Sequence, residues 1–117
     1  MNEKKRVDMK VSINAYDLIP EILGSRFDYW IWWADVKYDV GYEWNRYPDD
    51  PKKKFLWLKI DDPKHEEGSG KYVRKKVSVQ DIADGFVKSG AQSWRDLDAG
   101  SSDFIMQWVV LGDYVYC

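Results

Sequence analysis

The sequence predicts an α+β fold: an antiparallel sheet of about four to five strands with three helices packed on one face. Segments with a period of two residues are grouped in the middle of the chain, and segments with a helical period stand at both ends. A chain of 117 residues is long enough for one domain with its own core. We therefore expect residues 1–117 to form a single domain, with residues 1–6 as a flexible N-terminus.

Several segments have the alternating pattern or the aromatic and β-branched content of strands. The clearest is residues 7–13, in which apolar and polar side chains alternate. Turn-forming Asp, Pro and Gly residues separate the later segments, which favours an antiparallel meander. The expected strands are residues 7–13, 29–39, 55–60, 72–77 and 114–116.

Three segments have apolar residues at helical spacing. Residues 15–23 follow Asn14, a good N-cap, although Pro20 predicts a kink or a late start. Residues 79–89 follow Ser78, and the acidic residue three positions later completes a capping box. The third helix is expected over residues 103–111. The aromatic residues assigned to the core of the last two helices are Phe86, Phe104 and Trp108.

The composition excludes several classes of protein. The net charge of −2 argues against binding of a long nucleic acid. We expect no membrane-spanning segment and no secretion signal, because no apolar stretch is long enough and the start of the chain is charged. A single cysteine, Cys117, permits no internal disulfide and points to a reducing cytosol.

We find no residues suited to catalysis. The one histidine, His65, lies in a polar segment rich in Asp, Glu, Gly and Ser, where it is not held as a catalytic base needs to be. Acidic pairs beside proline are typical of turns and lack the spacing of a calcium loop. The expectation is a protein that is not an enzyme and holds neither metal nor cofactor, with metal-free phosphodiester cleavage as the less favoured alternative.

Aromatic residues give the strongest indication of function. The chain contains seven tryptophans, three of them within residues 29–33. If this segment is a strand, Trp30 and Trp32 point to one face, and Tyr29 and Trp33 point to the other. At least one face then carries rings outside the core, where they stack on another protein, another subunit or a base.

Basic residues near the predicted sheet complement these rings. Arginine holds phosphate with two hydrogen bonds, and a base stacks well on Trp or Tyr. Short basic clusters such as residues 74–76 suit a small anion better than a long phosphate backbone. The expected ligand-binding residues are Arg26, Tyr29, Trp30, Trp33, Trp57 and Arg74.

The pattern of residues 79–86, 103–107 and 111–116, together with Tyr29-Trp30-Ile31, resembles a family of small uncharacterised proteins of tailed bacteriophages. Members tend to have Gly where this chain has Cys117, and a Gly/Ser run in place of residues 25–28. The resemblance implies an accessory protein, with a possible anti-defence role, that acts in the host cytoplasm. It supplies no catalytic residues.

Three functions are consistent with these observations. The first is a counter-defence protein that binds and sequesters a nucleotide-derived signal of host immunity without cleaving it. The second is an inhibitor that masks a host defence protein through an aromatic patch. The third is an oligomeric phage accessory protein without a ligand. A sheet with rings on both faces also leads us to expect a homo-oligomer.

Overall fold

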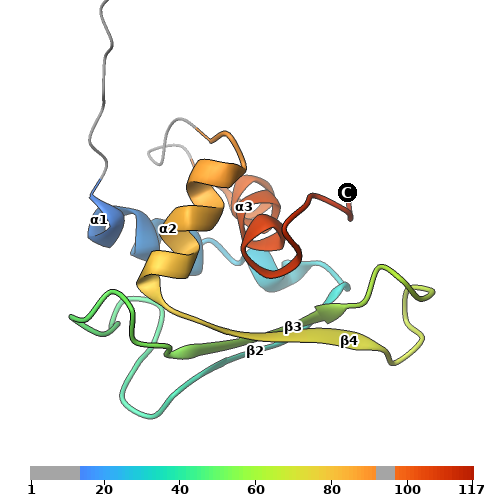
Figure 1. Ribbon diagram of the computed structural model, residues 1–117, viewed down its shortest axis with the longest axis horizontal. Coiled ribbons are helices and arrows are strands. Elements are labelled where there is room, and N and C mark those ends of the chain that lie inside the picture. The colour runs from blue at the N-terminus through green and yellow to red at the C-terminus, as the bar shows by residue number, and fades with distance from the viewer. Residues whose placement is uncertain (1–13, 92–96) are drawn as a thin grey trace, which may run out of the picture.

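The computed structural model describes residues 14–91 and 97–117. The predicted strand over residues 7–13 and the flexible N-terminus at residues 1–6 lie outside this part of the chain. Figure 1 shows a sheet with all three α-helices on one side of it. In chain order, the elements are α1 (Ala15–Leu23), the 3₁₀ helix η1 (Phe27–Tyr29), β2 (Trp33–Tyr38), β3 (Leu56–Asp61), β4 (Tyr72–Val77), α2 (Val79–Lys88) and α3 (Ala99–Leu111).

The predicted α+β class and the antiparallel sheet are confirmed. The sheet has three strands in the order β2-β3-β4, and both pairings are antiparallel. The predicted four to five strands are therefore not found within the described residues. In that part of the chain, no helix is long and apolar enough to cross a membrane.

The central strand β3 decides which face of the sheet is covered. Leu56, Leu58 and Ile60 alternate along it and are fully buried. Because side chains alternate across a strand, Trp57 and Lys59 must point to the other face. The helices cover the first face, and the second remains open in the described structure (Figure 1).

The helix caps agree with the sequence patterns. The Asn14 side chain accepts a hydrogen bond from the Tyr16 N–H, and α1 begins at Ala15 as predicted, with Pro20 inside it. Ser78 and Asp81 form the predicted capping box of α2.

The third helix begins earlier than predicted, at Ala99. Asp98 is its N-cap and accepts a hydrogen bond from the Ser101 N–H at 2.8 Å. The two aromatic residues assigned to its core, Phe104 and Trp108, are only half-buried, whereas Phe86 on α2 is buried as expected.

The predicted strand over residues 29–39 is wrong in its first part. Arg26 adopts a left-handed conformation with φ 66°, and η1 follows it directly. The Trp33 N–H then donates to the Trp30 carbonyl at 3.1 Å, which closes a turn. Only at Trp33 does β2 begin, and its register with β3 shifts between Trp33 and Asp35. The expected alternation of residues 29–33 therefore does not occur.

The predicted last strand over residues 114–116 is also absent. This segment packs beside α3, where the Gln107 side chain replaces a neighbouring strand as hydrogen-bond partner. Its Oε1 accepts from the Val115 and Tyr116 N–H groups at 3.0 and 2.9 Å, and its Nε2 donates to the Tyr116 carbonyl. One buried side chain thus satisfies the backbone of the C-terminal segment.

Candidate functional site

The residues predicted to bind a ligand fall into two separate groups. Trp57 and Arg74 lie on β3 and β4, on the open face of the sheet. Arg26, Tyr29 and Trp30 belong to the segment around η1, which contacts α3, and Trp33 follows it at the start of β2. The structure therefore does not bring all of these residues into one site.

Trp33 is occupied by contacts within the protein. It is only 6% exposed, and its indole N–H donates to Asp103 Oδ1 at 2.6 Å. The Trp32 indole donates to the same oxygen at 2.8 Å, and Gln107 donates to the other oxygen at 3.1 Å. These hydrogen bonds fix both indoles in the core, so little of the Trp33 ring is left for a ligand.

Burial raises the pKa of the Asp103 carboxyl above its ordinary value, and the three donated hydrogen bonds offset this only in part. Asp103 therefore connects the tryptophan segment to α3 through a group whose charge is costly to bury. These contacts give Asp103 a structural role, because its hydrogen-bond donors, Trp32, Trp33 and Gln107, are all buried side chains.

Trp30 and Tyr29 are more accessible. Trp30 stacks on Trp32 with ring centres 5.9 Å apart, and Trp32 stacks on Tyr116 at 5.6 Å. Tyr29 is 75% exposed and meets the Trp30 ring edge-on. Arg26 is exposed at the start of this segment. Because stacking fills the protein side of the Trp30 ring, Tyr29 is the ring with most free area here.

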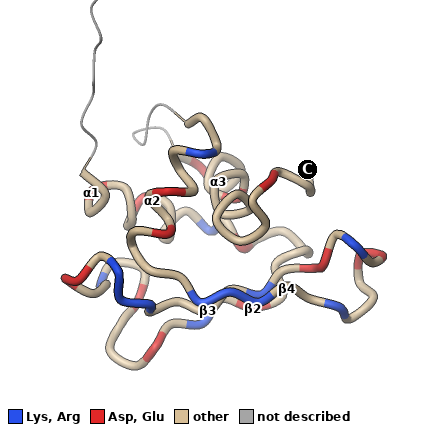
Figure 2. The backbone as a smooth tube through the Cα atoms, viewed as in Figure 1, with Lys and Arg blue, Asp and Glu red and all other residues tan. Residues whose placement is uncertain are grey.

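The open face of the sheet carries an aromatic and basic surface. The strand register places Lys59 beside Arg74, and Trp57 between Lys37 and Lys76. Side chains of directly paired residues point to the same face. Figure 2 shows the basic residues as a nearly continuous band along β4 and its neighbours, below the layer of helices.

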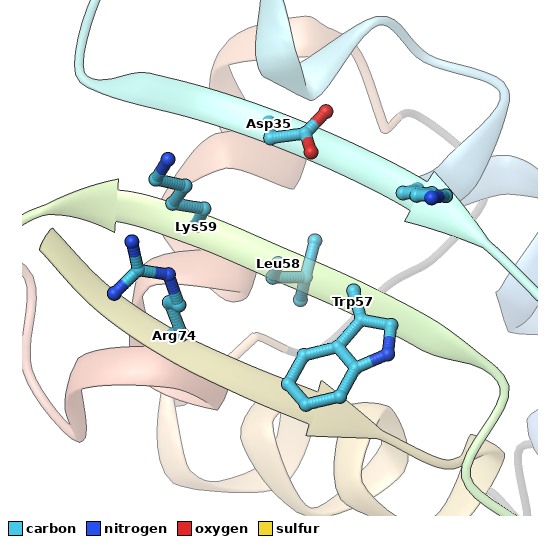
Figure 3. A pocket seen from close by; sticks show the side chains of 6 residues that line it. Asp35, Trp57, Leu58, Lys59 and Arg74 are labelled. Carbon is cyan, nitrogen blue, oxygen red and sulfur yellow. The ribbon is translucent and has the colours of Figure 1, made fainter.

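A shallow cavity of about 320 Å³ lies in this surface. Its lining comes from all three strands. Figure 3 shows Lys59 and Arg74 side by side on adjacent strands, with the Trp57 ring farther along the same strand pair. The lining residues are Asp35, Lys37, Trp57, Leu58, Lys59 and Arg74.

The surroundings of the cavity orient its side chains. Trp57 is 45% exposed, and the Lys76 ammonium lies 5.7 Å from the ring centre. Lys76 also forms an ion pair with Asp39 at 2.7 Å. The Lys59 ammonium lies 4.4 Å from the centre of the Tyr72 ring. The cations at the rim are thus supported by aromatic rings and by one carboxylate.

Sequence reasoning missed Lys37 and Lys59 as site residues, and it named Lys76 only as part of the basic cluster at residues 74–76. The signal that identifies Lys59 is present in the sequence, because the alternation of Leu56-Trp57-Leu58-Lys59 places it on the same face as Trp57. Lys37 is identified only by the strand register, whereas Lys76 shares a face with Arg74 because it lies two residues farther along β4. The basic cluster at residues 74–76 is divided between faces: the Lys75 ammonium instead donates to the Val109 carbonyl of α3 at 2.8 Å.

Within residues 14–91 and 97–117, no three His, Cys, Asp or Glu side chains are grouped in a way that suits a metal ion. The cavity on the open sheet face offers a stacking surface, ammonium groups and a guanidinium group. No protein-family model, curated protein or solved structure matches this chain.

Proposed function

We propose that this protein binds a small nucleotide-type ligand on the open face of its sheet and releases it unchanged. The observation that carries the proposal is one cavity in which an exposed tryptophan, Trp57, lies beside the cross-strand pair Lys59 and Arg74. A ring and two cations are the groups that a base and a phosphate require.

Lys59 and Arg74 are the proposed phosphate-binding groups. In the described part of the chain, neither forms an ion pair with an acid, so both are available to an anion. The guanidinium of Arg74 can donate two parallel hydrogen bonds to phosphate oxygens. Lys59 adds a second charge: it is paired with Arg74 across the two strands, and its ammonium lies over the Tyr72 ring.

Trp57 is the proposed stacking surface. The Lys76 ammonium lies over the Trp57 ring, and the ring also lines the cavity. A base stacked on such a ring contributes roughly 1–3 kcal/mol to binding. The cavity volume of about 320 Å³ is at the lower limit for ligand pockets, which is about 300 Å³. This size favours a small ligand over a long nucleic acid.

The biological setting that we propose is the cytoplasm of an infected host. There the protein sequesters a nucleotide-derived immune signal. The resemblance of residues 79–86, 103–107, 111–116 and 29–31 to phage proteins supports this setting, and the open cavity supports the ligand class.

A second candidate function is inhibition of a host defence protein by direct contact. Tyr29 and Ile31, which are 75% and 81% exposed, favour it because large exposed side chains of this kind serve as anchors in interfaces. Tyr29 lines neither of the two cavities described for this sheet, so a Tyr29 variant distinguishes the two functions.

The test is calorimetric titration of the protein with nucleoside monophosphates. We expect Arg74→Ala to weaken binding at least tenfold, because a hydrogen bond to a charged group contributes about 1.5–3 kcal/mol. Lys88→Ala is the charge-matched control, since Lys88 is exposed on α2 away from the cavity.

Trp57→Leu tests the stacking surface in the same titration. Trp44→Leu is its matched control, because Trp44 is 46% exposed, as Trp57 is 45% exposed, and does not line the cavity. The proposal requires a large loss of affinity only for Trp57→Leu. The absence of binding by any nucleotide would leave the inhibitor function as the better account.

A further inference from the structure

A second cavity lies where β3 ends and β4 begins, at the paired residues Asp61 and Tyr72. Its volume is about 590 Å³, and it is lined by Ile31, Ala34, Asp61, Glu67, Gly68 and Tyr72. Both of its charged side chains are carboxylates, whereas the first cavity has three basic side chains and one carboxylate. Its walls also include the exposed Ile31 and the half-buried Tyr72.

Asp61 is the unusual residue in this cavity. It is only 5% exposed, yet it lines the cavity. Within the described residues, no hydrogen bond or ion pair reaches its carboxylate. Its backbone is held on both sides: the Asp61 N–H donates to the Trp32 carbonyl at 2.9 Å, and its carbonyl accepts from the Tyr116 hydroxyl at 2.8 Å. A fixed backbone thus presents a nearly buried acceptor to a cavity.

The two cavities follow one another along the same strands. On β3, Trp57, Lys59 and Asp61 occupy every second position and share the open face. On β4, Tyr72 pairs with Asp61, and Arg74 pairs with Lys59. Successive groups on this face are therefore about 6.6 Å apart along the strand. Their order is a stacking ring, then a pair of cations, then a carboxylate beside a second ring.

This order matches a ligand with a phosphate between two bases. One base stacks on Trp57, the phosphate lies at Lys59 and Arg74, and the second base enters the cavity of Asp61 and Tyr72. Ile31, which is 81% exposed, and Ala34 supply apolar area for that second base.

The carboxylate selects among bases. An ionised carboxylate only accepts hydrogen bonds. Guanine alone among the common neutral bases presents two adjacent donors, N1–H and the 2-amino group, on its pairing edge. Adenine and cytosine present a ring-nitrogen acceptor beside their amino group, and uracil flanks its one donor with two carbonyls. A carboxylate faces repulsion from each of these acceptors.

We propose that the ligand is a dinucleotide, linear or cyclic, that carries guanine, and that Asp61, assisted by Glu67 from the loop between β3 and β4, recognises this guanine. This inference rests on the proposed function, because it assigns the phosphate to Lys59 and Arg74. It goes further in naming the ligand class and a second recognition site.

The experiment measures dissociation constants for the dinucleoside monophosphates GpG, IpI and ApA, and for cyclic di-GMP and cyclic di-AMP. We expect GpG to bind at least tenfold more tightly than ApA, and IpI, which lacks the 2-amino group, to lie between them. The two cyclic compounds should differ in the same direction. The tighter of GpG and cyclic di-GMP identifies whether the preferred ligand is linear or cyclic.

Two variants locate the selectivity. Asp61→Asn replaces the acceptor-only group with an amide of similar shape, and we expect GpG to lose at least tenfold in affinity while ApA changes less than threefold. Glu67→Gln, on an exposed residue where folding is not at risk, should reduce the same preference to a smaller extent.

Equal affinity for GpG and ApA, with Arg74→Ala still weakening both, would overturn the guanine assignment and leave the proposed function intact. If no nucleotide or dinucleotide binds, the proposed function and this inference fail together.

Discussion

Asp103 Oδ1 accepts the indole N–H of Trp33 at 2.6 Å across 70 residues of sequence. The same oxygen accepts from Trp32, and the other carboxylate oxygen accepts from Gln107. The Trp33–Asp103 hydrogen bond joins the start of β2 to α3. Together with the bond from Trp32, it keeps two indole rings in the core and away from the surface.

Removal of this carboxylate is expected to destabilise the protein strongly. Asp103→Ala leaves two indole N–H groups and one of the two N–H bonds of the Gln107 amide without an acceptor in the core. Each unsatisfied buried group costs about 1–3 kcal/mol, so we expect the free energy of unfolding to fall by about 3 kcal/mol or more. Asp84→Ala, at an exposed position on α2, should change it by less than about 0.5 kcal/mol. Urea denaturation measures both, and equal effects would contradict the structural role of Asp103.

The stability contribution of Asp103 should depend on pH with a defined sign. Burial raises the pKa of this carboxyl in the folded protein, so the folded state retains the proton to higher pH than the unfolded chain does. The part of the free energy of unfolding that depends on this bound proton is fully present below the unfolded pKa of about 3.9. It is lost as pH rises through the folded pKa.

Asp103→Asn provides the comparison, because its amide does not titrate and its oxygen still accepts from both indoles. We expect the stability difference, wild type minus variant, to decrease from pH 4 toward pH 7. A difference that increases over this range would show that the carboxylate is stabilised by its donors more than it is destabilised by burial.

Helices α2 and α3 cross at a glycine. A Cβ atom added to Gly85 would lie 2.2 Å from Val109 Cγ2 and 3.1 Å from the Val109 backbone. Gly85→Ala should therefore destabilise the protein by about 1–3 kcal/mol through overpacking, although alanine is the better helix former. Val87→Ala, at a highly exposed position on the same helix, is the control and should be nearly neutral. Thermal unfolding compares them, and an unchanged midpoint for Gly85→Ala would refute this close packing.

The C-terminal segment should depend on a single side chain. Gln107→Leu removes the acceptor for the Val115 and Tyr116 N–H groups while keeping a similar volume. We expect the amide protons of these two residues to exchange with solvent much faster in the variant. Exchange at Leu58, in the central strand, serves as the internal reference and should hardly change. Continued protection of both amides would mean that other contacts hold the segment.

Self-association remains a prediction, and the open face gives it a specific form. If two copies associate through the surface of Trp57, Lys59 and Arg74, a bound nucleotide competes with the partner. Sedimentation velocity at high micromolar concentration should then show a dimer whose proportion falls when nucleotide is added. A monomer at all concentrations would exclude the homo-oligomer, and a dimer insensitive to nucleotide would place the interface elsewhere.

The sequence correctly predicts those helices and strands whose ends are set by neighbouring residues, such as a helix cap or an alternation of apolar and polar side chains. Asn14 and Ser78 cap α1 and α2 as expected, and the alternation of Leu56, Leu58 and Ile60 identifies the covered face of β3. The same alternation also assigns Trp57 and Lys59 to the opposite face.

The wrong predictions arise where contacts between residues far apart in the sequence determine the local structure. The aromatic run at residues 29–33 has the composition of a strand, but the left-handed conformation of Arg26 and the hydrogen bonds to Asp103 impose a turn. No local pattern reveals a partner 70 residues away. For the same reason, sequence alone could not separate Trp33, which is held in the core, from Trp57, which is free to contact a ligand.

The central claim is that the ligand binds at Trp57 and not at the tryptophan segment around η1. Nuclear magnetic resonance tests it most directly, because each of the seven indole N–H groups gives its own signal. On titration with a guanine nucleotide, the account predicts large shifts for the Trp57 indole and for the backbone amides of Lys59 and Arg74, with the Trp33 indole unmoved. Shifts confined to Tyr29 and the Trp30 indole would contradict it.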